Sequence, residues 1–260
     1  MIPPVQPFRL PGMHRLISSK YSRSGTVLED VTNTDADLAT ATALDAATNE
    51  RVLGETRGLA GISPFELVYG FANAHIIRAA FLHPNKAGGS RFNDTSRGAW
   101  YAAEEVETSI AEVAYHRARR LSDIIDPDVP DQALPSDRAT YDDWQADFHA
   151  DFHVLAPASN FSECLEREPV PECYQAPQAL ARKLLSQQSN GVVYPSVRRE
   201  GARCLACFRP ALVYSPRRDR RYELLLTRKD GGYETRVSIG DPEDDSLARK
   251  PAVRRRGRYH

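Results

Sequence analysis

Hydrophobic positions along the chain follow the two-residue period of strands in most segments and the wider period of a helix in a few. Short apolar or alternating runs predict strands over residues 13–21, 99–103, 152–156, 190–196, 203–208, 211–215, 222–228 and 232–238. Apolar residues at helical spacing, or a run rich in alanine, predict helices over residues 35–53, 105–121 and 176–188. Strands mixed with a few helices predict an α+β fold.

Capping and proline-rich patterns predict one further helix and two irregular segments. Ser63, with a proline after it and Glu66 three residues on, has the pattern of a capping box and predicts a short helix to about Tyr69. The proline-rich first twelve residues predict an irregular arm. The Asp- and Pro-rich residues 122–146 predict an excursion on the surface.

The chain is expected to form one domain over residues 1–245, because no low-complexity linker or charge block divides it. Residues 23–87 would be a mostly helical insertion within that domain, and residues 246–260 a basic, flexible tail.

Charge and hydropathy exclude several classes of partner. The formal net charge of −1 gives no reason to expect direct binding to nucleic acid or to an anionic membrane. No apolar run approaches the roughly 20 residues of a membrane span. The N-terminus also lacks the apolar core of a secretory signal. The sequence therefore predicts a cytoplasmic protein, and it leaves open whether that protein is a monomer or a homo-oligomer.

Cysteine and histidine spacing gives no metal motif. Without an export signal, four cysteines are expected to be reduced structural thiols: Cys164, Cys173, Cys204 and Cys207. The last two form a CxxC, but no second CxxC stands at zinc-ribbon spacing. His149 and His153 form HxxxH without the glutamate of the zinc-protease motif. The sequence therefore predicts neither a metal nor a bound cofactor.

Three segments contain residues suited to chemistry on an anionic substrate. The glycines before Arg91 would let backbone N–H groups approach a phosphate, but the residues alone favour a plain turn before a surface arginine, because the P-loop and Rossmann spacings are absent. Glu112, on the helix after the 99–103 strand, is either a solvated residue paired with His116 or a carboxylate facing a cleft. Ser196 follows a proline at a strand end, where its side chain would be exposed as a turn or hydrogen-bonding residue.

Taken together, these segments resemble the RES domain, a family named for an Arg, a Glu and a Ser. The resemblance rests on three motifs in order: GGSRFN at 88–93, AWYAAEEVETSIAEV at 99–113 and GVVYPSVR at 191–198. It covers roughly residues 88–208 together with the first strand.

The resemblance implies an ADP-ribosyltransferase-like mixed β core with surrounding helices. It also implies an enzyme that degrades NAD⁺ by hydrolysis or phosphorolysis of the nicotinamide–ribose bond, as the toxin paired with a helix-turn-helix antitoxin. NAD⁺ is then a substrate, and phosphate a co-substrate if the reaction is phosphorolysis. The implied roles, residue by residue, are Arg91 on the phosphates or the attacking anion, Tyr101 near the nicotinamide or its ribose, Glu112 as the catalytic carboxylate, Ser196 on the polar wall, and Asn93 in substrate binding.

Two departures from the family pattern leave other functions open. About 65 residues separate the first strand from the GGSRFN turn, and Ser90 is inserted between the glycines and Arg91. An ADP-ribosyltransferase that modifies a macromolecule would use the same pocket. A non-enzymatic module that binds an acidic partner through its basic C-terminal tail would leave Glu112 as a surface residue.

Overall fold

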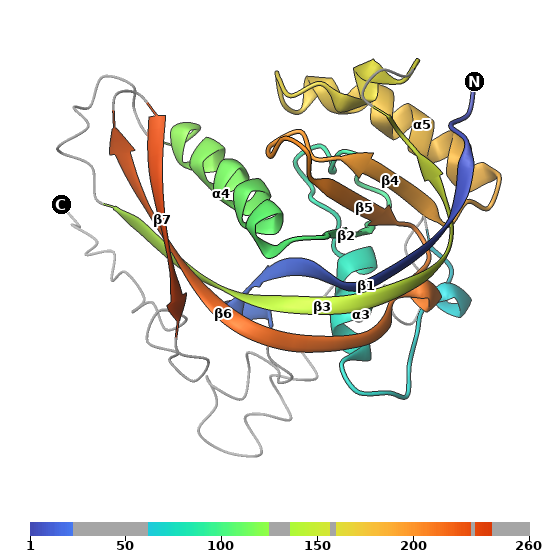
Figure 1. Cartoon of the computed structure of the whole chain (residues 1–260), viewed down its shortest axis with the longest axis horizontal. Coiled ribbons are helices and arrows are strands. Elements are labelled where there is room, and N and C mark those ends of the chain that lie inside the picture. Colours follow the sequence, from blue (N-terminus) through green and yellow to red (C-terminus); the bar gives the residue numbers. More distant parts are fainter. Residues whose placement is uncertain (23–61, 125–135, 157–159, 230–231, 241–260) are drawn as a thin grey trace, which may run out of the picture.

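The computed structural model describes residues 1–22, 62–124, 136–156, 160–229 and 232–240. In this part of the chain, seven strands form one sheet in the order β1-β2-β5-β4-β3-β6-β7, and three α-helices pack against it (Figure 1). This is the α+β architecture that the hydrophobic pattern predicts. The finer expectation of an ADP-ribosyltransferase-like core stays a prediction.

The bounds of the elements are as follows. The strands are β1 (Val5–Ser18), β2 (Trp100–Ala103), β3 (Asp137–Val154), β4 (Gly191–Pro195), β5 (Arg203–Cys207), β6 (Tyr214–Lys229) and β7 (Gly232–Gly240). The α-helices are α3 (Ala74–Leu82), α4 (Val106–Ser122) and α5 (Gln175–Ser186). Short 3₁₀ helices are η1 (Ser19–Tyr21), η2 (Pro64–Glu66), η4 (Ser162–Leu165), η5 (Glu172–Tyr174) and η6 (Pro210–Leu212). No helix in these described ranges is both long and apolar enough to cross a membrane.

Five of the strands close into a ring. Strand β1 pairs with β2 at His14 and also with β3 along most of its length, so β1, β2, β5, β4 and β3 return to their starting point. Strand β3 pairs in parallel with β4, and the other neighbours are antiparallel. The hairpin of β6 and β7 extends the sheet beyond β3, and α4 lies over the concave side of these long strands (Figure 1).

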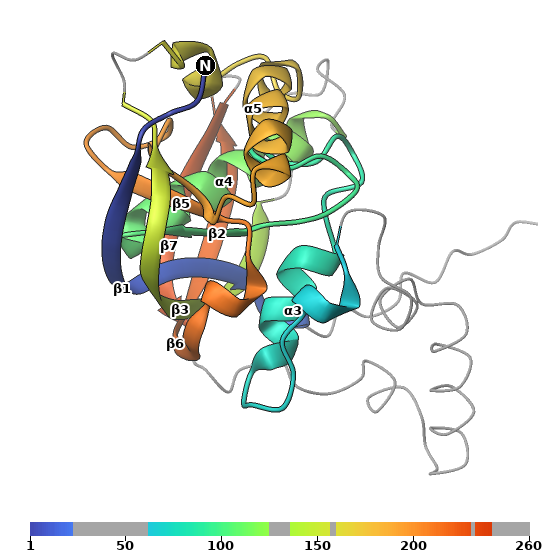
Figure 2. The ribbon, with the colours of Figure 1, turned by 90° about the vertical axis from the view of Figure 1, so that its right-hand side faces the viewer.

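The short strands β2, β4 and β5 are buried on both faces, which explains their continuous apolar sequences. Alternate residues of these strands, such as Trp100 and Leu205, join one core cluster with Ile77 and Phe81 of α3. The intervening residues join a second cluster with Leu184 of α5. In both views α5 lies above these strands and α3 below them (Figures 1 and 2).

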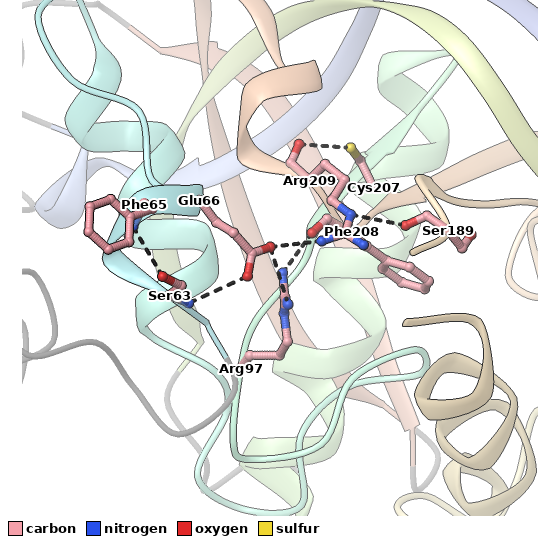
Figure 3. A network of polar contacts seen from close by, with 8 residues as sticks. All are labelled: Ser63, Phe65, Glu66, Arg97, Ser189, Cys207, Phe208 and Arg209. Carbon is pink, nitrogen blue, oxygen red and sulfur yellow. Dashed lines mark hydrogen bonds and ion pairs between the residues drawn. The ribbon is translucent and has the colours of Figure 1, made fainter. Parts of the chain in front are cut away.

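A polar network fastens η2 to the sheet (Figure 3). The capping box predicted at Ser63 is present, although the helix it starts ends at Glu66. The Glu66 carboxylate then bridges Arg97 at 3.7 Å and Arg209 at 2.9 Å. Arg97 is 8% exposed and donates from Nη2 to the carbonyl oxygen of Phe208 at 2.7 Å. The network therefore anchors both η2 and the loop that leads into β2.

The prediction of an irregular N-terminal arm is wrong. Strand β1 begins at Val5, which pairs with His153 of β3. Prolines are tolerated here because, within the described residues, the second edge of β1 pairs only at His14. The pairing shifts between Leu10 and Met13, which is a bulge of the kind that proline and glycine favour.

The surface excursion predicted over residues 122–146 is also wrong in its second half. Strand β3 starts at Asp137, and its residues 141–144 are buried in the sheet. Two of these are carboxylates: Asp142 forms a buried ion pair with Arg221, and Asp143 lies 2.7 Å from Nδ1 of the partly buried His14. Local composition therefore suggested a polar loop where long-range pairing makes a buried strand.

Most other predicted elements are confirmed, although three of the predicted strands, over residues 13–21, 152–156 and 222–228, are parts of longer strands that start at Val5, Asp137 and Tyr214. One prediction is wrong. Residues 211–215 were predicted as a strand, but η6 occupies Pro210–Leu212, and β6 starts at Tyr214. Proline at the first position of this turn favours the helical start. The helix predicted over residues 35–53 and the tail over 246–260 lie outside the described residues, as do most of the predicted insertion and residues 125–135.

Candidate active site

A pocket of about 360 Å³ lies between α4 and the ends of β1, β2, β4 and β5. The residues that line it are Arg15, Leu16, Ser90, Arg91, Tyr101, Ala102, Ala103, Ser109, Glu112, Val113, His116, Arg117, Arg120, Tyr141, Tyr174, Tyr194 and Cys204. Three of the four main sequence candidates, Arg91, Tyr101 and Glu112, are among them. The fourth, Ser196, lies directly behind Glu112 and is hydrogen-bonded to it.

The turn before Arg91 is closed by its own backbone. Ser90 N donates to Asn93 O at 2.8 Å, and Asn93 N donates to Ser90 O at 3.3 Å. Gly89 has φ +76°, and a Cβ on it would lie 2.2 Å from Asn93 O, so a side chain there is excluded. From α5, Gln178 Nε2 lies within hydrogen-bond distance of the carbonyl oxygens of Gly88, Ser90 and Asn93. The turn is therefore held rigid and presents Arg91 to the pocket.

Arg91 is fixed by the segment around η4. Its Nη1 donates to the carbonyl oxygens of Cys164 at 3.0 Å and Glu166 at 2.9 Å, and its guanidinium carbon lies 5.3 Å from the ring centroid of Tyr174. The side chain is only 5% exposed, and Nη2 has no hydrogen-bond partner in the described part of the chain. A buried, always-charged guanidinium with an unused donor is suited to an anionic ligand.

Tyr101 supports this turn from β2. Its hydroxyl accepts a hydrogen bond from Phe92 N and donates one to Asn93 Oδ1, both at 2.8 Å. Asn93, expected to bind substrate, is engaged within the turn, since its Nδ2 also donates to the carbonyl oxygen of Asp94. Tyr101 therefore lines the pocket and also stabilises the turn that contains Arg91.

Replacing Tyr101 by Phe should loosen the turn that bears Arg91. The hydroxyl is lost, and Phe92 N is left unsatisfied in a buried setting, which costs about 1–3 kcal/mol of unfolding free energy. Urea denaturation should show that loss, with Tyr214→Phe, at an exposed position, as the matched control. Equal stability of the two variants would contradict the role given to the Tyr101 hydroxyl.

Glu112 is held by Ser196 on the wall opposite Arg91. The Ser196 hydroxyl accepts from the backbone N–H groups of Arg198 at 3.2 Å and Arg199 at 3.1 Å, and it donates to Glu112 Oε1 at 3.1 Å. Both lone-pair directions of the serine oxygen are occupied, so its proton is directed to the carboxylate. This geometry makes Ser196 an orienting residue rather than a nucleophile.

Burial and nearby cations have opposite effects on the pKa of Glu112. Burial raises the pKa of this carboxyl group, while Arg198, the Ser196 hydrogen bond and Arg91 oppose that rise. Desolvation in the pocket wall and then the positive charges of Arg198 and Arg119 lower the pKa of His116, so its imidazole is neutral at neutral pH. Glu112 is therefore governed by Ser196 and the arginines rather than by pairing with His116.

Arg15 of β1 is a pocket residue that the sequence did not single out. Its Nη1 donates to Tyr101 O at 3.1 Å, its guanidinium carbon lies 5.1 Å from the centroid of the Trp100 ring, and its Nε has no partner in the described residues. Burial lowers its pKa to about 10, which leaves it charged at neutral pH. The sequence offers no clear signal for this role, because Arg15 is one of several polar residues in its strand and follows His14 directly.

The four cysteines are free and buried, as expected of structural thiols. Burial raises the pKa of Cys204 and Cys207 to about 12, so neither is a thiolate at neutral pH, although Cys204 borders the pocket. Among the residues that the structure describes, no three His, Cys, Asp or Glu side chains are grouped closely enough to hold a metal ion.

Comparison with known proteins identifies one family. The model of the RES domain matches residues 67–227, which is more than half of the chain. That range contains Arg91, Tyr101, Glu112 and Ser196, whereas Arg15 reaches the same pocket from outside it. A search of curated proteins finds no match to the chain.

Proposed function

The chain belongs to the RES-domain family, and we propose that it cleaves the nicotinamide–ribose bond of NAD⁺ as the toxin of a toxin–antitoxin pair. The observation that carries the proposal is a partly buried carboxylate, Glu112, in a pocket whose lining also includes four arginines. Of the lining arginines, Arg117 forms an ion pair with Asp137, whereas Arg15, Arg91 and Arg120 form none with another residue that the structure describes. This excess of positive charge favours a ligand with a diphosphate.

The proposed chemistry requires few functional groups. The C1′–N bond breaks with both electrons going to the nicotinamide nitrogen, so nicotinamide leaves as a neutral base without a general acid. The ribose acquires oxocarbenium character, which the Glu112 carboxylate stabilises. The aromatic walls at Tyr101, Tyr174 and Tyr194 suit a flat ring. Arg15 and Arg91 offset the charge of the diphosphate.

The acceptor then decides the product. If water attacks C1′, the products are ADP-ribose, nicotinamide and a proton. If inorganic phosphate attacks, the product is ADP-ribose carrying a phosphate on that carbon. The unused donor of Arg91 suits either the diphosphate or an attacking phosphate. An antitoxin of the helix-turn-helix class, covering the pocket, is part of the proposal.

Product analysis tests this proposal directly. Purified protein incubated with NAD⁺ and no macromolecular acceptor should release free nicotinamide. The products are identified by mass spectrometry after reaction in buffers with and without phosphate. ADP-ribose in both buffers would indicate hydrolysis, and a phosphorylated ADP-ribose in the phosphate buffer would indicate phosphorolysis. Labelling that requires a protein or nucleic-acid acceptor would instead indicate an ADP-ribosyltransferase. Intact NAD⁺ under all these conditions would overturn the proposal.

A further inference from the structure

We propose that Arg198 is a positioning residue for Glu112, locked behind Ser196 so that its positive charge keeps the carboxylate ionised inside the pocket. The inference rests on the proposed function, because it assigns Arg198 a part in the same reaction. Arg198 does not line the pocket, so it acts through Glu112 and Ser196 rather than on the substrate.

The Arg198 side chain is clamped on several sides. Its guanidinium carbon lies 3.4 Å from the ring centroid of Tyr115, which stands one turn beyond Glu112 on α4. Nη1 lies 3.5 Å from the carboxylate of Glu168, and Nη2 donates to Arg167 O at 3.0 Å. The side chain is 9% exposed. Because Glu168 also accepts a hydrogen bond from the Tyr115 hydroxyl, the ring beneath Arg198 is fixed as well.

The same segment connects the two sides of the pocket. Residues Cys164 and Glu166 hold Arg91 through their carbonyl oxygens. Arg167, the next residue, donates from Nε to the carbonyl oxygen of Val197 and accepts from Arg198. The backbone N–H of Arg198 in turn donates to Ser196 Oγ. One continuous set of contacts therefore runs from Arg91 to Ser196, and Arg198 is the link between Arg167 and Ser196.

Among the groups around Glu112, Arg198 has the largest lowering effect on the pKa of its carboxyl group. Burial raises the pKa of Glu112, and the strongest opposition comes from the charge of Arg198, ahead of the Ser196 hydrogen bond, Arg91 and Arg167. The other titratable groups that line the pocket with Glu112 are His116, Arg117 and Arg120 on α4, Tyr101 on β2, Tyr194 on β4, Cys204 on β5, Tyr174 on η5, Arg15 on β1, Tyr141 on β3, and Arg91. Burial keeps Tyr101, Tyr174, Tyr194 and Cys204 neutral at neutral pH, so they do not replace the charge of Arg198.

The test compares Arg198→Gln with a neighbouring arginine. Arg199 is the matched control, because its side chain pairs with Glu105 and Thr108 at the start of α4 and not with the surroundings of Glu112. In Arg198→Gln, the acid limb of the kcat–pH profile for nicotinamide release should move up by about one unit or more, as expected when an opposite charge is removed from beside a carboxyl group. KM should change less than kcat. Arg198→Lys should restore part of the shift.

Two results would overturn the proposal. One is an Arg198→Gln profile that coincides with those of the wild type and Arg199→Gln. The other is a loss of activity in Arg198→Gln that is equal at every pH, which is what a merely structural role predicts. The titration of the Glu112 carboxyl carbon, followed by ¹³C NMR, should show the same upward shift without any need for turnover. A protein that releases no nicotinamide but still shows that shift would refute the proposed function and leave the positioning role intact.

Discussion

Replacing Glu112 by Gln should reduce kcat/KM for nicotinamide release by about 10²- to 10³-fold, or roughly 2.7–4 kcal/mol of transition-state stabilisation. The substitution keeps the shape of the side chain and an oxygen that can accept from Ser196. It removes only the negative charge that would face the developing oxocarbenium ion. The measurement is the initial rate of nicotinamide release under saturating and limiting NAD⁺.

The same substitution should stabilise the folded protein at neutral pH. Burial raises the pKa of Glu112 in the folded state above its ordinary value of 4.5, so ionising it at higher pH costs folding free energy. Glutamine carries no charge at any pH. The stability gain of Glu112→Gln should therefore grow as pH rises above that value and disappear below it. A gain in stability together with a loss of activity is typical of a catalytic residue in a destabilising site.

Glu107→Gln provides the matched control on the same helix. Glu107 is an exposed residue in the first turn of α4, so its variant should change neither nicotinamide release nor stability by much. If Glu112→Gln retained wild-type kcat/KM, Glu112 would not be the carboxylate of the reaction. If it lowered activity and stability together, disruption of the fold would explain the loss.

The sequence located three pocket residues, and Ser196 behind them, because their positions depend on short-range features. The Arg91 turn needs glycine at position 89, Tyr101 sits in a short buried strand, and Glu112 follows on the next helix. Ser196 ends β4 after a proline. The ordered motifs therefore brought them together, although spacing alone left each one open to a structural explanation.

Arg15 and Arg198 could not be assigned in this way, since their roles depend on contacts between distant segments. Arg15 donates a hydrogen bond to the carbonyl oxygen of Tyr101, which lies 86 positions away in the sequence. The guanidinium of Arg198 packs on the ring of Tyr115, which projects from α4. The side chain of Asn93 forms hydrogen bonds within the turn, a role that its place in the motif did not indicate, and its part in substrate binding stays a prediction. Residue type and spacing indicate which residues are near the site, whereas hydrogen-bond direction decides what each one does.

Strand β3 shows why part of the fold was not predictable from local pattern. Its sequence YDDWQAD has charges where a buried strand normally has apolar residues. Asp142 is 1% exposed, and Arg221 of β6, also 1% exposed, donates to its carboxylate from Nε at 2.7 Å and from Nη2 at 3.1 Å. The partner lies 79 positions away. The residues around Asp142 in the sequence show that a carboxylate would have to be buried, but they do not include Arg221, the partner that offsets the cost of burying it.

Replacing Asp142 by Asn should consequently reduce the free energy of unfolding by about 3–5 kcal/mol, because it removes the buried carboxylate charge that Arg221 pairs with through two hydrogen bonds. The measurement is urea denaturation at neutral pH. Glu234→Gln, which breaks an exposed pair with Lys229 in the β6–β7 hairpin, should cost less than about 1 kcal/mol.

A double variant tests whether the stability of β3 depends on the Asp142–Arg221 ion pair itself. Asp142→Leu with Arg221→Met removes both charges, and it should recover much of the stability that Asp142→Asn loses, because a buried ion pair contributes little net free energy over apolar residues of similar volume. No recovery would mean that β3 depends on the geometry of these hydrogen bonds and not on charge balance alone. Equal losses for Asp142→Asn and Glu234→Gln would mean that Arg221 finds another partner, and the account of why β3 tolerates its carboxylates would then fail.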